Sequence, residues 1–183
     1  MESYLTEFFC YCIYFPAALL CYLPMRNQLK YGVKKTLIGM GLLMCISVPL
    51  LALIDVAWSV GYNVLLMPTM LVFLFIYQKT LKTPFCQTLA VFVLVCALLS
   101  FNSNFANAFD AFLHPTATIE DYSLEAGAFQ FGLNVAFAAV LFYPLAKYGS
   151  WLIDHFRIRK VWYIATAVSA VFLIFNILIV PQR

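Results

Sequence analysis

The sequence predicts an all-α polytopic membrane protein, a single domain of residues 1–183 built as a bundle of about six transmembrane helices. Of its 183 residues, 64% are hydrophobic and only 10% are charged, whereas soluble domains carry roughly 25% charged residues. The mean hydropathy is +0.91. A span needs roughly 20 apolar residues, and the chain has several such runs. The predicted spans are about 4–23, 36–54, 63–77, 85–109, 126–145 and 161–180.

The boundaries of the first three spans follow from charged residues and short connections. Glu2 and Glu7 stand where a signal peptide would carry basic residues, so we expect a retained helix. A basic loop at 24–35 separates it from the second span, which is closed by Asp55. A short connection through Gly61 leads to the third span, after which a second basic loop begins.

The last three spans are bounded by polar residues and prolines. The fourth begins near Phe85, and its helical periodicity continues toward His114, with Pro115 as a stop signal. A polar, acidic stretch then leads to the fifth span. The loop after it is basic, and the sixth span ends before Pro181.

The charges of the loops predict the orientation. Ten of the eleven Lys and Arg residues lie in the loops 24–35, 78–84 and 146–160, the exception being Arg183. Seven of the eight Asp and Glu residues lie at the opposite membrane face, the exception being Asp154. Because Lys and Arg in short loops stay on the cytoplasmic side, we expect both termini outside.

Polar residues gather in the outer half of the predicted bundle, where we look for a site because polar groups within lipid are costly. On the fourth helix they share one face, opposite a phenylalanine face at Phe101, Phe105, Phe109 and Phe112. These residues either line a ligand cavity open to the exterior or make interhelical hydrogen bonds, and 102–114 could also form a solvated loop. The candidate ligand-binding residues are Asn104, Asn107, Asp110, Gln130, Asn134 and Asn176.

Motifs for catalysis and for cofactor binding are absent from the sequence. There is no glycine-rich phosphate loop, no H-E-x-x-H and no G-x-S-x-G, so no catalytic residue, metal site or cofactor is predicted. The six cysteines fit small packing residues. The basic loops fit topology determinants and lipid-headgroup contacts, and no nucleic-acid partner is expected.

One segment carries a family resemblance. Residues 23–37, Leu-Pro-Met-Arg-Asn-Gln-Leu-Lys-Tyr-Gly-Val-Lys-Lys-Thr-Leu, resemble the loop after the first helix of GHKL-type sensor histidine kinases of Gram-positive bacteria. The N-terminal part of that family is a multi-helix membrane sensor. The resemblance implies a sensor module in the bacterial plasma membrane, with the kinase domain beyond residue 183, after one more span. The resemblance assigns no ligand-binding residue to this sequence.

Two functions are therefore expected, with a third left open. The first is a signal-sensing module of a two-component sensor kinase, which binds a small or lipophilic ligand from outside and shifts its helix packing. The alternative is a small six-helix transporter or substrate-binding subunit of an uptake system. A structural subunit without a ligand is the third. The lipid bilayer is the expected partner, and the sequence does not decide whether the chain forms a homodimer.

Overall fold

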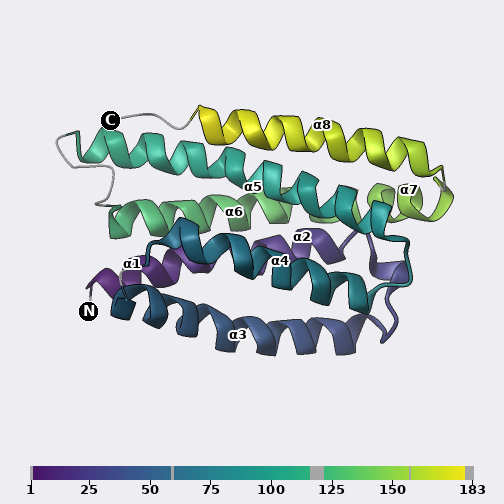
Figure 1. The fold of residues 1–183 in the computed structure, drawn as a ribbon, viewed down its shortest axis with the longest axis horizontal. Coiled ribbons are helices and arrows are strands. Elements are labelled where there is room, and N and C mark those ends of the chain that lie inside the picture. Colours follow the sequence, from purple (N-terminus) through teal and green to yellow (C-terminus); the bar gives the residue numbers. More distant parts are fainter. Residues whose placement is uncertain (1, 59, 116–121, 157, 180–183) are drawn as a thin grey trace.

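A computed structural model describes residues 2–58, 60–115, 122–156 and 158–179, and these ranges are all-α. The helices lie side by side along one axis (Figure 1). They are α1 (Glu2–Tyr11), α2 (Tyr14–Tyr22), the short 3-10 helix η1 (Arg26–Gln28), α3 (Val33–Trp58), α4 (Tyr62–Thr80), α5 (Phe85–Leu113), α6 (Leu124–Pro144), the π-helical turn η2 (Leu145–Gly149), α7 (Ser150–His155) and α8 (Arg159–Leu178).

The two ends of the bundle carry opposite charges. One end holds the connections 23–32, 81–84 and 156–158, on the right in Figure 1. We call it the basic end, because eight described Lys and Arg residues lie in or beside these connections. The other end holds the α3–α4 turn and the start of α6, with Asp55 and Glu125, and we call it the acidic end.

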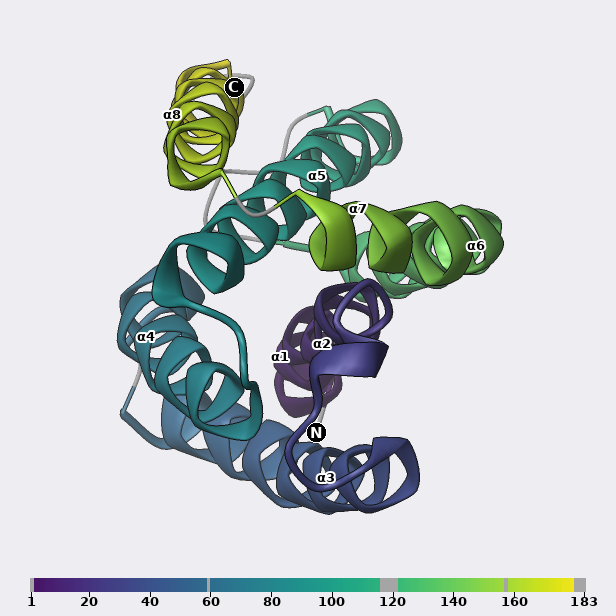
Figure 2. The same cartoon turned by 90° about the vertical axis from the view of Figure 1, so that its right-hand side faces the viewer.

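The first span forms the centre of the bundle, where α1 and α2 follow one another with a break at Cys12 and Ile13. Pro16 has no N–H to donate to the carbonyl of Cys12, and the Phe15 N–H donates to that carbonyl instead, at 3.1 Å. Figure 2 shows α3, α4, α5 and α6 arranged around this kinked helix. It has 61% of its residues buried, against 17% for α8, which packs on α5 at the periphery.

Gly127 lies at the contact between α1 and α6, where an added Cβ would make ordinary van der Waals contacts. A Cβ at this position would lie 3.4 Å from the Cβ of Phe9 and 3.6 Å from the Thr6 carbonyl oxygen. At the periphery, by contrast, α3 presents an apolar stripe of Ile38, Leu42 and Ile46 that is more than 60% exposed. An exposed apolar surface of this kind is typical of a helix that faces lipid or another protein.

Among the described residues, five helical segments are long and apolar enough by length and composition to cross a bilayer. They lie at the positions of five of the six predicted spans. The sixth, α4, has a shorter apolar stretch, Val64–Thr80. It nevertheless joins the acidic end to the basic end, because α3 ends at the former and α5 begins at the latter (Figure 1).

The helices extend beyond several predicted boundaries. α5 runs to Leu113, so most of the 102–114 stretch is helix rather than a solvated loop. The prediction of a loop at 146–160 is largely wrong, since helical structure continues from Leu124 to His155. Pro144 does not end it, since the chain continues from Pro144 into a π-helical turn and then into α7.

Candidate functional site

Polar side chains tie α5 to α6 in the half of the bundle toward the acidic end. Asn102 Nδ2 donates to Asn134 Oδ1 at 3.0 Å, and Gln130 Nε2 donates to Ser103 Oγ at 2.7 Å. Asp110 is fully buried and accepts a hydrogen bond from Ser123 Oγ. Two of these bonds start at adjacent residues of α5, and the third lies about two turns further along it.

A separate pair ties α5 to α8. Asn104 Nδ2 donates to the backbone oxygen of Asn176 at 3.1 Å, and Asn176 Nδ2 donates to Phe172 O at 3.0 Å. Asn104 is half-buried, and Asn176 is buried.

Five of the six candidate residues therefore lie in two interfaces rather than around one cavity. A helix turns about 100° per residue, so Asn102 and Asn104 point roughly 200° apart, one toward α6 and the other toward α8. Asn107 is half-buried on α5 and takes part in none of these bonds. Of the predicted phenylalanine face, Phe105 and Phe112 are exposed. The other two rings pack against neighbouring helices, since Phe109 stacks on Phe129 of α6 at a centroid distance of 4.3 Å and Phe101 meets Phe172 of α8.

Among the candidate residues, the Asn134 side chain has an unfilled hydrogen-bonding position. Its side chain is fully buried, and its Nδ2 has no hydrogen-bond partner, whereas Gln130 is bonded at both ends through Ser103 and Tyr122. The cavities found elsewhere in the bundle are lined by other residues. The geometry of the amides thus fits interhelical hydrogen bonds, and ligand binding by them stays a prediction.

A carboxyl cluster joins α1 to the α3–α4 turn at the acidic end. Asp55 is 5% exposed and accepts hydrogen bonds from the Tyr11 hydroxyl at 2.8 Å and from the Gly61 N–H at 2.9 Å. Glu7, one turn before Tyr11, lies near Asp55, and its Oε2 is buried without a hydrogen-bond partner among the described residues. The sequence analysis predicted Asp55 only as the end of a span. Glu7 and Asp55 are 48 residues apart, and this spacing does not indicate that the two carboxyl groups lie close together.

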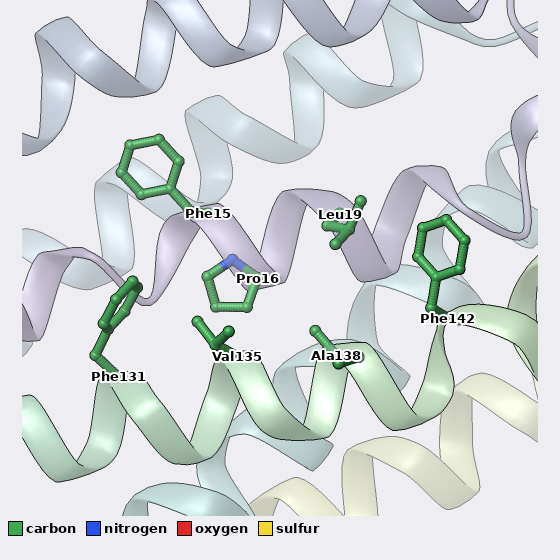
Figure 3. A pocket seen from close by; sticks show the side chains of 8 residues that line it. Phe15, Pro16, Leu19, Phe131, Val135, Ala138 and Phe142 are labelled. Atoms are coloured by element: carbon green, nitrogen blue, oxygen red, sulfur yellow. The ribbon is translucent and has the colours of Figure 1, made fainter.

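An apolar groove lies between α2 and α6, and we call it the α2–α6 groove. Its volume is about 580 Å³, and Figure 3 shows its walls facing one another, with the Pro16 ring turned toward α6. No polar side chain lines it. The lining residues are Phe15, Pro16, Leu19, Phe131, Val135, Ala138, Ala139 and Phe142.

The groove continues toward the basic end as a second cavity of about 200 Å³. The two share Leu19 and Phe142, and the second also borders α3 at Val33 and the loop residue Arg26. Sequence analysis missed this feature, because an apolar residue that faces a groove cannot be distinguished by pattern from one that faces lipid.

Comparison with known proteins returned no protein family, no curated protein and no solved structure that matches this chain.

Proposed function

We propose that this chain is a sensing module embedded in the bacterial plasma membrane, with its basic end in the cytoplasm, and that its ligand is lipophilic. The observation that carries this proposal is the α2–α6 groove beside a kinked central helix. A ligand shifts helix packing only if it binds two arrangements unequally. Material that fills the groove would favour the arrangement in which α2 and α6 stand apart.

The kink allows α2 to move relative to α6 in such a response. The segment around Cys12 and Ile13 lacks a regular helical hydrogen bond because of Pro16, so α2 can tilt with little change in α1. At the other end α2 is anchored through the Cys21 carbonyl, which accepts a hydrogen bond from Tyr77 at 2.7 Å. A displacement of α2 would therefore be passed to α4 and to the loop that follows.

Filling the groove with a side chain tests the proposal. Ala139 lines the groove from its rim and is exposed, so Ala139→Phe should hold α2 and α6 apart and remove the response to a ligand. The measurement is the distance distribution between spin labels at positions 31 and 148 in a cysteine-free background. We expect added phosphatidylglycerol to shift the distribution in the parent protein and to leave Ala139→Phe unchanged.

The matched control is Ala136→Phe, which adds the same ring on the same helix at an exposed residue outside the groove. It should respond as the parent protein does. A parent protein whose distance distribution is the same with and without lipid would contradict the sensing proposal.

A further inference from the structure

We propose that the ligand of the α2–α6 groove is an anionic phospholipid, with an acyl chain along α2 and α6 and its phosphate at Arg26. This inference deepens the proposed function and rests on it for the site. It follows from the shape of the groove, from the charge at its end and from the rigidity of the loop that carries that charge.

The length of the groove fits an acyl chain. Its α6 wall runs from Phe131 through Phe142 to Ala146, which at 1.5 Å per residue is about 22 Å. One leaflet of the hydrocarbon core is about 15 Å thick, half of the roughly 30 Å of the whole core. A chain that starts at the basic end would therefore fill the groove and reach past the bilayer centre.

The charge at the mouth of the groove selects the headgroup. Arg26 lines the basic-end cavity and is exposed, and no hydrogen bond or ion pair joins its guanidinium to another residue in the described part of the chain. A guanidinium offers two parallel donors that match a phosphate. Asp154 is the carboxylate of this end, and it accepts hydrogen bonds from Asn27 and Gln28 instead.

Those same bonds hold Arg26 in position. Asn27 Nδ2 and Gln28 Nε2 bind the two carboxylate oxygens of Asp154 at 2.8 and 2.5 Å. On the other side, Pro24 packs against Gly149, where a Cβ would come within 2.9 Å of the Pro24 Cβ. The loop is thus fixed against η2 and α7 on both sides of Arg26, and the phosphate contact costs little ordering of the loop.

Photo-crosslinking in vesicles tests this site. The protein is reconstituted in vesicles that contain phosphatidylglycerol or phosphatidylcholine with a photoreactive group in the acyl chain, and labelled peptides are quantified. We expect phosphatidylglycerol to label α2 and the 131–146 segment preferentially. Arg26→Gln should lower this labelling about fivefold, since one Arg near an anionic headgroup contributes about 1 kcal/mol. Ala139→Phe should lower it for both lipids.

Two matched controls define the result. Lys82→Gln removes one positive charge at the same end but away from the groove, and Ala136→Phe adds the same ring elsewhere on α6; both should label as the parent protein does. Equal labelling by the two lipids, labelling spread evenly over α3, α4 and α8, or competition by inorganic phosphate would each overturn the phospholipid assignment.

The outcome is separable from that of the proposed function. Preferential labelling without a change in the spin-label distances would leave the phospholipid site standing and remove the sensing proposal. If phosphatidylcholine alone changed the spin-label distances and the labelling were even, the sensing proposal would stand and the anionic phospholipid site would be ruled out.

Discussion

Replacing Asp55 by alanine is expected to lower the free energy of unfolding by about 1–3 kcal/mol, the usual cost of leaving a buried donor without its acceptor. The change leaves the buried Tyr11 hydroxyl without its acceptor and also removes the bond to the exposed Gly61 N–H. Because these bonds join α1 to the α3–α4 turn, the acidic end should loosen as a unit. Denaturant titration in mixed micelles, followed by circular dichroism, measures the loss.

The comparison for this variant is Glu125→Ala. Glu125 is an exposed carboxylate in the first turn of α6 at the same end of the bundle. Its interaction with the helix dipole contributes only about 0.3–1 kcal/mol. A loss of similar size for both variants would mean that the Asp55 network does not hold the end of the bundle together.

Replacing Tyr77 by alanine is the second change with a large expected effect, about 3–5 kcal/mol for a large buried side chain. Tyr77 is fully buried, stacks on Phe73 and meets Tyr22 edge-on at a centroid distance of 5.0 Å. Its hydroxyl anchors α2 through the Cys21 carbonyl. Thermal unfolding of the detergent-solubilised protein measures the change.

The neighbouring residue Phe75 supplies a control on the same helix. Its ring is 70% exposed, so Phe75→Ala removes a contact with lipid or detergent and little packing. Tyr77→Phe, which keeps the ring but loses the hydroxyl, should cost about 1 kcal/mol. If Phe75→Ala were as destabilising as Tyr77→Ala, the packing of α4 described above would be incorrect.

The all-α class and the positions of the apolar helices could be predicted, because they depend on local composition. Runs of apolar residues mark the helices, and Pro115 marks the end of α5. The boundary after Pro144 was missed for a physical reason: a proline usually ends a helix, but here a π-helical turn continues it to His155.

The candidate site was less predictable, because it depends on which helices become neighbours. Periodicity placed Asn104 and Asp110 on one face of α5, but α6 and α8 divide that face between them. Asn102 lay outside the predicted face and is nevertheless buried against Asn134. Periodicity within one helix carries no information about where its neighbours lie.

The most direct test is the orientation of the chain in the membrane, with the basic end in the cytoplasm and the acidic end outside. Cysteines are introduced singly at Tyr31, which is 64% exposed at the basic end, and at Glu125, which is exposed at the acidic end, in a cysteine-free background. An impermeant maleimide is then added to intact cells. We expect labelling at position 125 and none at position 31 until the membrane is permeabilised. Labelling at position 31 from outside would contradict this orientation.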